Sequence, residues 1–191
     1  MVARLVILAS GDGSLAQAII DAEQRGDLAV TIVAVISDRV SAPVLTRAGI
    51  AGIPTVTQPM RKDRREWDKR IFRLVDSLHP DLVVCAGFMR ILSSEFVTHF
   101  KTVNSHPALL PLFPGAHAVR DALKSGAKVT GTSIHWVDEG VDTGRVIAQA
   151  EVEILHDDDE ASLHERIKIV ERRLIVSTIQ ELLPTLESRN V

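Results

Sequence analysis

The sequence of 191 residues contains one cysteine and no tyrosine, and aromatic residues make up only 4% of it. A single thiol cannot form an internal disulfide, which fits a protein of the reducing cytoplasm. Because Cys85 lies in the apolar run 82–86, we expect its side chain to be buried and unreactive. The scarcity of aromatic rings also argues against a surface on which nucleobases stack.

Long apolar runs and basic runs are missing as well. No stretch approaches the roughly 20 apolar residues of a membrane-spanning helix, so we expect a soluble protein. The formal net charge is -3 and the isoelectric point is about 6.2, which argues against nucleic acid or an acidic membrane as the main partner. The seven histidines are scattered along the chain, so no metal site is expected.

The first half of the chain alternates short apolar runs with helical patterns. The runs 5–9, 30–37 and 82–86 are continuous and rich in β-branched residues, as in strands that are covered on both faces. Amphipathic helices are predicted around 15–22 and 67–78, and a weaker helix around 44–48 precedes a short strand at 55–56. This alternation predicts a Rossmann-like, doubly wound α/β fold with a mostly parallel sheet.

The second half has a different pattern. Residues 130–137 and 146–154 are extended segments on either side of the turn 138–144, which predicts an antiparallel hairpin. A long amphipathic helix follows the acidic stretch 157–160, whose charges are favourable at a helix start. Because no linker or repeat interrupts the chain, residues 1–191 are expected to form a single domain.

A glycine-rich turn, Ser10–Ser14, follows the first predicted strand and leads directly into a helix. Backbone amides at such a helix start can bind a phosphate without a basic side chain. The spacing of Gly11, Gly13 and Ala16 also fits a dinucleotide-binding fingerprint, in which Asp38 would bind a ribose. A tight turn without any ligand is the remaining alternative.

An amide and an imidazole lie close together in the segment Asn104–Pro111, after a predicted strand at 101–103. Near neutral pH an imidazole serves as a general acid or base, and an amide can donate to a developing oxyanion. A carboxylate such as Asp142, in the turn 138–144, would orient His106 and favour its charged form if the two side chains meet. Otherwise the turn is an ordinary acidic one.

The chain carries four motifs in a fixed order, Ser10–Ser14, Ala86–Leu92, Asn104–Gly115 and Gly140–Gly144. Together they resemble the phosphoribosylglycinamide (GAR) formyltransferases, the folate-dependent enzymes of de novo purine biosynthesis, over nearly the whole chain. The resemblance implies a formyltransferase fold, with a nucleotide-binding half at about 1–100 and a folate-binding, catalytic half at about 101–191. It implies formyl transfer from the co-substrate 10-formyltetrahydrofolate to the amine of GAR, without a metal. It also allows a homodimer.

The resemblance further implies roles for individual residues. The catalytic trio would be Asn104, His106 and Asp142. The residues implied to bind GAR are Gly13, Ser14, Leu15, Lys168 and Glu171, and an exposed i,i+3 salt pair is the alternative for the last two. The residues implied to bind the folate are Arg64, Met89, Arg90, Ile91, Leu92, Asn104, Asp138, Glu139, Gly140, Val141 and Asp142.

Two positions depart from the family pattern. Position 145 is arginine where relatives often carry proline, directly after the turn implied to bind folate. The chain also ends soon after Pro184, so the family's final strands would be absent or reduced and one sheet edge less covered. Earlier in the chain, the clustered prolines after His106 predict a cis peptide bond at Leu110–Pro111.

Three other functions compete with formyl transfer to GAR. A 10-formyltetrahydrofolate hydrolase would use the same trio with water as acceptor, but water needs no phosphate site. An NAD(P)-binding module would use Gly11–Ala16 and Asp38, and would leave the segments 104–111 and 138–144 unexplained. A non-catalytic nucleotide-binding subunit would not require an intact trio.

Overall fold

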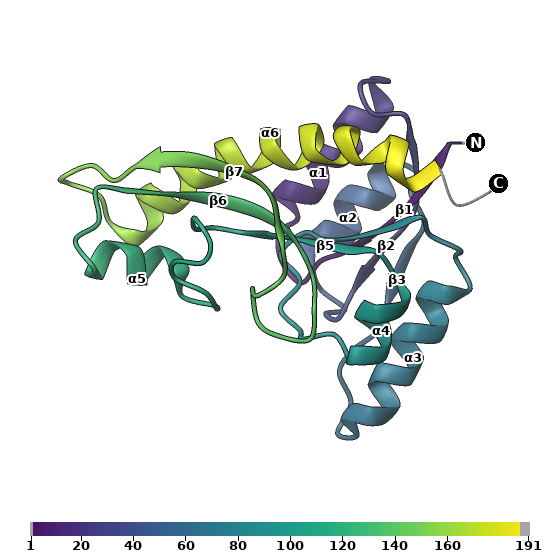
Figure 1. Ribbon diagram of the computed structural model, residues 1–191. Helices are drawn as coiled ribbons and strands as arrows, with labels where there is room; N and C mark the ends of the chain where they lie inside the picture. Colours follow the sequence, from purple (N-terminus) through teal and green to yellow (C-terminus); the bar gives the residue numbers. More distant parts are fainter. Residues whose placement is uncertain (1, 188–191) are drawn as a thin grey trace.

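The computed structural model describes residues 2–187, which contain one seven-stranded sheet with helices on both faces (Figure 1). The strands lie in the order β3-β2-β1-β4-β5-β6-β7. The first five in sequence run parallel, and β6 and β7 run antiparallel to their neighbours. Their bounds are β1 Ala3–Leu8, β2 Val30–Ser37, β3 Thr55–Thr57, β4 Leu82–Cys85, β5 Thr102–His106, β6 Val129–Trp136 and β7 Val146–Glu153.

Helices cover the two faces of the sheet unequally. The helices α1, α2 and the long α6 pack on one face, α3 and α4 pack on the other, and α5 lies beneath the outer part of the β6–β7 hairpin (Figure 1). Within residues 2–187 no helix is long and apolar enough to cross a membrane. The helix bounds are α1 Ser14–Gln24, α2 Pro43–Ile50, α3 Arg64–Asp76, α4 Ser94–His99, α5 Ala118–Lys124 and α6 Glu160–Glu187.

The apolar patterns of the sequence become two cores, one on each face of the sheet. Leu5, Ile7 and Val84 point to the α1–α2–α6 side, whereas Val6 and Val83 point to the α3–α4 side. Successive side chains of a strand face opposite sides, so continuous apolar runs are the expected signature of strands covered twice. The predicted doubly wound, mostly parallel sheet with an antiparallel hairpin and a long C-terminal helix is confirmed.

Cys85 lies at the end of β4, in the core between the sheet and α3–α4. Its thiol is buried and unpaired as predicted, and burial raises its pKa to about 12. The thiolate that would react with other groups is therefore essentially absent at neutral pH.

The boundaries of β5 differ from the expected ones. The sequence predicts a strand at 101–103 that ends before the amide–imidazole pair, but β5 runs from Thr102 to His106. Pairing with β6 extends it, because Asn104 lies opposite His135 and His106 lies opposite Ser133. Asn104 and His106 are therefore held by the sheet itself and not by a loop that follows it.

The second edge of the sheet is formed by β7, whose one strand neighbour is β6. The predicted hairpin is confirmed, and its turn spans the residues between Trp136 and Val146. Residues 188–191 lie outside the described residues, and the expectation that the family's final strands are absent or reduced falls on this end of the chain.

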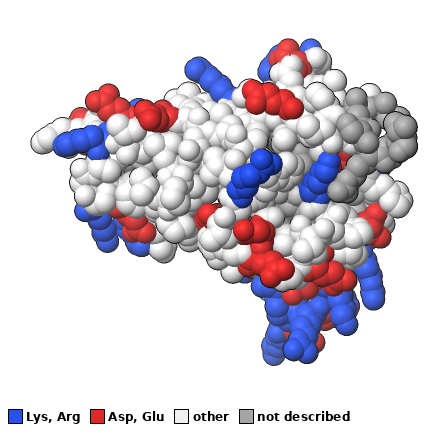
Figure 2. Space-filling view, viewed as in Figure 1, with Lys and Arg blue, Asp and Glu red and all other residues white. Residues whose placement is uncertain are grey.

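Charged side chains gather at one end of the molecule. Figure 2 shows lysine and arginine concentrated in the lower part of the view, where α3 lies. This helix carries Arg64, Arg65, Lys69, Arg70 and Arg73 within 13 residues. The N-terminus of α3 is stabilised by Asp63, whose carboxylate accepts a hydrogen bond from the amide of Glu66.

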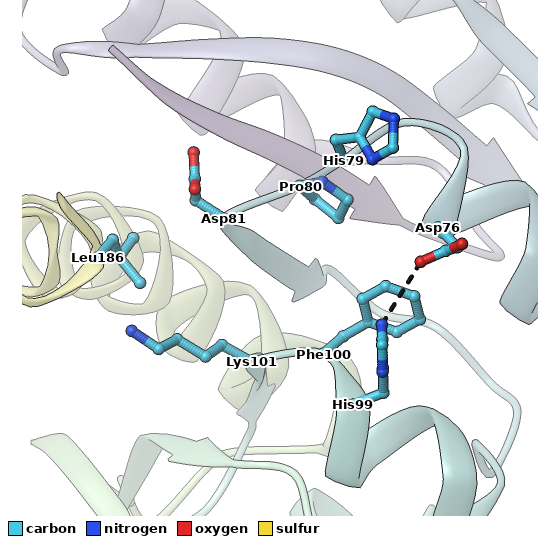
Figure 3. Close-up of a pocket in the computed structure, with 8 residues that line it drawn as sticks. All are labelled: Asp76, His79, Pro80, Asp81, His99, Phe100, Lys101 and Leu186. Atoms are coloured by element: carbon cyan, nitrogen blue, oxygen red, sulfur yellow. Dashed lines mark ion pairs between the residues drawn. The ribbon is translucent and has the colours of Figure 1, made fainter. Parts of the chain in front are cut away.

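A hollow of about 300 Å³ lies at the amino ends of β4 and β5 (Figure 3). Asp81 and Lys101, which line it, directly precede these two strands, and an ion pair between Asp76 and His99 spans 3.4 Å at its side. Asn104 and His106 lie at the opposite, carboxyl end of β5. The hollow is therefore separate from the candidate site.

Candidate functional site

Three side chains implied to be catalytic meet at the carboxyl end of β5. Nδ1 of His106 lies 3.2 Å from Oδ2 of Asp142, and Nδ2 of Asn104 lies 3.4 Å from Oδ1 of the same carboxylate. The side chains of His106 and Asp142 are 4% and 11% exposed. The sequence could not show that the strand and the hairpin turn come together, and the structure places them in contact.

Both ring nitrogens of His106 face oxygen atoms. Nε2 lies 2.8 Å from the carbonyl oxygen of Phe113, opposite the contact of Nδ1 with Asp142. A carbonyl and an ionised carboxylate only accept hydrogen bonds, so a ring that makes both bonds donates from both nitrogens. The geometry therefore suits a doubly protonated, positively charged imidazole.

His135 is a fourth member of the cluster, and the sequence interpretation missed it. Its Nδ1 donates to the carbonyl of Trp136 at 2.9 Å, while Nε2 lies 3.2 Å from Nδ2 of Asn104 and 3.4 Å from Oδ1 of Asp142. Only 2% of the residue is exposed. The signal that could have found it is the strand register, because a hairpin closing at 138–144 brings His135 opposite Asn104.

The carboxylate of Asp142 is held in its ionised form. Burial alone would raise its pKa, but hydrogen bonds from His135 and from the Gly115 amide, together with the charge of His106, hold the pKa below its usual value. The Gly115 amide donates to Oδ2 at 2.8 Å. This negative charge faces Nδ1 of His106 across 3.2 Å.

The turn that carries Asp142 is conformationally constrained. Asp142 has a φ of 55°, in the left-handed region that side chains rarely adopt. At Gly144 an added Cβ would overlap the carbonyl of Trp136, so only glycine fits there. Asp138 accepts hydrogen bonds from the Gly140 amide (3.0 Å) and from the Thr143 hydroxyl (2.7 Å), which fixes the turn from inside.

The predicted phosphate loop lies at the same edge of the sheet, between β1 and α1. Gly13 occupies the N-cap position of α1 with a φ of 79°, and an added Cβ would overlap the side chain of Val44. Glycine is therefore required both by the backbone conformation and by the close approach of α2. The side chain of Leu15 is buried, so only its amide is directed to the helix start.

A carboxylate occupies part of this helix start. Oδ1 of Asp12 accepts the hydrogen bond of the Ser14 amide at 3.1 Å. The carbonyl of Asp12 in turn accepts a hydrogen bond from Nε of Arg47 at 2.8 Å, which ties the loop to α2. The Ser14 amide can meet a phosphate only after the exposed Asp12 side chain rotates away.

Lys168 and Glu171 lie on α6, and Glu171 contacts β5. Ser105, between Asn104 and His106, donates its hydroxyl hydrogen to Oε1 of Glu171 at 2.6 Å. Lys168 pairs with Glu165 at 2.8 Å and not with Glu171, so the alternative of an exposed Lys168–Glu171 salt pair is wrong. Burial raises the pKa of Glu171, and the Ser105 hydrogen bond only partly opposes this.

The segment after β4 forms a wall beside the cluster. Met89 and Ile91 leave 56% and 58% of their surface exposed, whereas Leu92 is buried. Arg64, at the start of α3, donates a hydrogen bond to the carbonyl of Ile91 and stacks over the ring of Trp67. Exposed apolar side chains on a backbone segment that Arg64 holds in place are suited to a flat, partly apolar ligand.

Asp38 does not have the role that a dinucleotide site would require. Its carboxylate is fully buried and accepts hydrogen bonds from Ser10 and Arg90. Both oxygens are thus occupied by protein groups, and neither is available to a ribose. The NAD(P)-binding alternative therefore loses its proposed ribose ligand.

The predicted cis peptide bond at Leu110–Pro111 is confirmed. Arg145, the departure from the family pattern, lies at the base of the hairpin. Its carbonyl accepts a hydrogen bond from the amide of Trp136 at 3.0 Å, and its side chain is exposed.

Comparisons with known proteins agree with this geometry. Residues 3–179 match the family model described as "Formyl transferase". A phosphoribosylglycinamide formyltransferase of Mycobacterium tuberculosis (strain ATCC 25618 / H37Rv) is 48% identical over 184 residues, which are 94% of this chain and 85% of the relative. The enzyme of that name from Escherichia coli (strain K12) is 41% identical over 174 residues, covering 89% of this chain and 82% of the relative.

Among solved structures, glycinamide ribonucleotide transformylase 1 from Symbiobacterium toebii superposes with a TM-score of 0.92 at 37% identity. The superposition covers 99% of this chain and 90% of that one. Sequence motifs, family model and fold thus agree. The chain belongs to the formyl transferase family.

Proposed function

We propose that the protein transfers the formyl group of 10-formyltetrahydrofolate to the amine of GAR, giving formyl-GAR and tetrahydrofolate. The observation that carries this proposal is the buried contact of His106 with Asp142 beside Asn104. The helix start at Gly13, where we propose that a phosphate binds, lies at the same edge of the sheet. Relatives named phosphoribosylglycinamide formyltransferase support the choice of substrates.

Formyl transfer develops negative charge on the formyl oxygen, and the cluster can stabilise it. The amine nitrogen bonds to the formyl carbon, giving a tetrahedral intermediate, and the bond from that carbon to N10 then breaks. Nδ2 of Asn104 carries two hydrogens, so one can face the oxyanion. Nε2–H of His106 reaches it by exchanging the carbonyl of Phe113 for the formyl oxygen. Each such donor contributes about 3–4 kcal/mol in comparable sites.

Asp142 has two tasks in this scheme. Its ionised carboxylate accepts a hydrogen bond from Nδ1 of His106 and so orients the ring, and His135 on its other oxygen holds it in place. It also positions a water that takes the proton lost by the attacking amine and returns it to N10, so that protons balance over the reaction. Neither task requires a metal.

The two substrates would bind to different elements of the fold. The phosphate of GAR would bind the amides of Gly13, Ser14 and Leu15, with Lys168 and Glu171 contacting the rest of GAR. The folate ring would lie between the wall Met89–Leu92 and the turn Asp138–Asp142. Arg64 and the basic α3 are suited to the carboxylates of the glutamate tail.

A phosphate site distinguishes this function from hydrolysis of 10-formyltetrahydrofolate, because water as an acceptor needs none. We also propose that residues 1–191 act as one formyltransferase domain, since a single sheet takes strands from both halves. The single, buried thiol is consistent with a cytoplasmic enzyme. A homodimer stays a proposal that a measurement of solution mass would test.

His106→Ala and Asp142→Asn test the assignment of the trio. Each should lower kcat for formyl transfer by about a hundred- to a thousandfold, because His106→Ala removes an oxyanion donor and Asp142→Asn removes the carboxylate that orients that donor. Binding of GAR should change little, because neither side chain belongs to the phosphate loop. Rates and GAR affinity are measured by following the release of tetrahydrofolate and by calorimetric titration.

The chain offers a matched control for these variants. His99 and Asp76 form another histidine–aspartate pair, 3.4 Å apart, in the hollow at the opposite end of the strands (Figure 3). His99→Ala and Asp76→Asn should keep wild-type kcat. A wild-type rate in His106→Ala or Asp142→Asn would refute the catalytic assignment.

A further inference from the structure

The turn after β1 and the segment after β4 meet through one serine. The Ser10 amide donates to the carbonyl of Gly87 at 3.1 Å, and the Ser10 hydroxyl accepts a hydrogen bond from the Met89 amide at 2.9 Å. Ser10 is itself buried. It joins the start of the phosphate loop directly to the wall Met89–Leu92.

A buried ion pair completes the link. The Ser10 hydroxyl donates to Oδ1 of Asp38 at 2.6 Å, and Nε of Arg90 donates to Oδ2 at 2.6 Å. The Asp38 side chain is 0% exposed, whereas 34% of the Arg90 side chain is exposed. A buried carboxylate is costly unless its charge is paired, and Arg90 supplies that charge. The guanidinium is therefore directed to Asp38 by a strong interaction.

We infer that Asp38 and Arg90 are positioning residues for the folate co-substrate, and that the Arg90 side chain acts through Asp38 and not by touching the folate. This inference rests on the proposed function and extends it. Arg90 stands between Met89 and Ile91, whose exposed side chains form the wall. The anchored guanidinium restrains the backbone at Arg90, and with it the positions of Met89 and Ile91.

The position of the network in the sheet explains why it would matter. Asp38, Ser10 and the segment after Cys85 follow β2, β1 and β4, which are neighbours in the sheet and end at the same edge. The hydrogen bonds run in one direction, from the Met89 amide to Ser10 and from Ser10 to Asp38, so each strengthens the next. The charge of Asp38 therefore determines the strength of both hydrogen bonds that it accepts, from Ser10 and from Arg90.

Two substitutions, alone and combined, separate the positioning role from direct contact. Asp38→Asn keeps an oxygen acceptor for Ser10 but presents an amide donor to Arg90, and Arg90→Ala removes the guanidinium. Each should raise the KM for 10-formyltetrahydrofolate about tenfold, the loss typical of a hydrogen bond to a charged group. The KM for GAR and kcat should change little. The double variant should be no worse than either single variant, because both remove the same link.

Direct contact of Arg90 with the folate gives a different result. In that case Arg90→Ala raises the folate KM by the same factor in the Asp38→Asn background, and multiplicative effects overturn the inference. A wild-type folate KM in Arg90→Ala overturns it as well. Arg25→Ala, which breaks the exposed Arg25–Asp27 pair just after α1 (2.7 Å), is the matched control and should leave both KM values unchanged.

Hydrogen exchange at the Met89 amide tests the link without any turnover. In Asp38→Asn and in Arg90→Ala this amide should exchange faster than in the wild type, while the amides of β4 stay protected. Unchanged exchange overturns the inference even if no formyl transfer is seen. A different outcome would contradict only the proposed function. In that case the wild type transfers no formyl group to GAR, although the Met89 amide still exchanges faster in the two variants.

Discussion

Glu171 is a largely buried carboxyl group whose ionisation lowers the stability of the folded protein. Burial raises the pKa of this carboxyl, against the partial opposition of the Ser105 hydrogen bond. Below the ordinary pKa of a glutamate, the group is protonated in both the folded and the unfolded state and costs nothing. As pH rises towards the folded-state pKa, the unfolded state ionises first, so stability is lost.

Glu171→Gln should therefore stabilise the ligand-free protein at neutral pH. The amide keeps an oxygen acceptor for Ser105 without a buried charge. Each kcal/mol recovered should raise the thermal midpoint by about 2–4 °C for a chain of this size. Unfolding scans should show the gain at pH 8 and little difference at pH 4.

Glu165→Gln is the control for this prediction, because Glu165 lies six residues earlier on α6, is exposed and pairs with Lys168. It should show no gain at pH 8. A Glu171→Gln midpoint at or below that of the wild type at pH 8 would contradict the account. If Glu171 contacts GAR as proposed, the same variant should also raise the KM for GAR.

At this scale the sequence predicted three of the four side chains that meet in the cluster at the carboxyl end of β5. Asn104, His106 and Asp142 were identified by motif, and the structure brings them together. His135 was not, because one histidine in an apolar strand has no local signal. Its role comes from the register of β6 against β5, which is a long-range property.

Among the elements, the start of α1 carries a negative side chain at the place where a negative phosphate is proposed to bind. The exposed carboxylate of Asp12 accepts the hydrogen bond of the Ser14 amide, where a phosphate is proposed to bind. A helix start attracts one anionic group, and two negative groups there repel each other. The acidic side chain therefore competes with the substrate phosphate.

Asp12→Asn should lower the KM for GAR by about two- to fivefold, the effect of one charge at a helix end. The gain should shrink at high salt, because the side chain is exposed and its charge is screened. Steady-state rates at low and high ionic strength measure this. Asp27→Asn, beyond the other end of α1 and paired with Arg25, is the control and should not alter the KM. A higher KM in Asp12→Asn would show that Asp12 assists GAR binding.

Elements were predicted in proportion to their length. The helices α1, α2, α3 and α6 have apolar faces that repeat often enough to be recognised, and all four are confirmed. The helices α4 and α5 have only six and seven residues, which is under two turns, and they were not predicted. Packing against the sheet and α6 stabilises such short helices, and a local pattern does not show this.

For the whole molecule, the decisive feature is that separate strand ends meet at one edge of the sheet. The phosphate loop follows β1, the wall follows β4, and the amide–imidazole pair ends β5. The hairpin turn then brings Asp142 back over that edge. The strand and helix alternation predicted the parallel sheet, and only the assembled structure showed the contact between turn and β5.

The acceptor dependence of deformylation tests the central claim most directly. The protein is mixed with 10-formyltetrahydrofolate, with and without GAR, and the release of tetrahydrofolate is followed together with the formation of formyl-GAR. The account predicts rapid release only when GAR is present, with one formyl-GAR formed for each tetrahydrofolate. Release at a similar rate without GAR, with free formate as the product, would contradict it and identify a hydrolase.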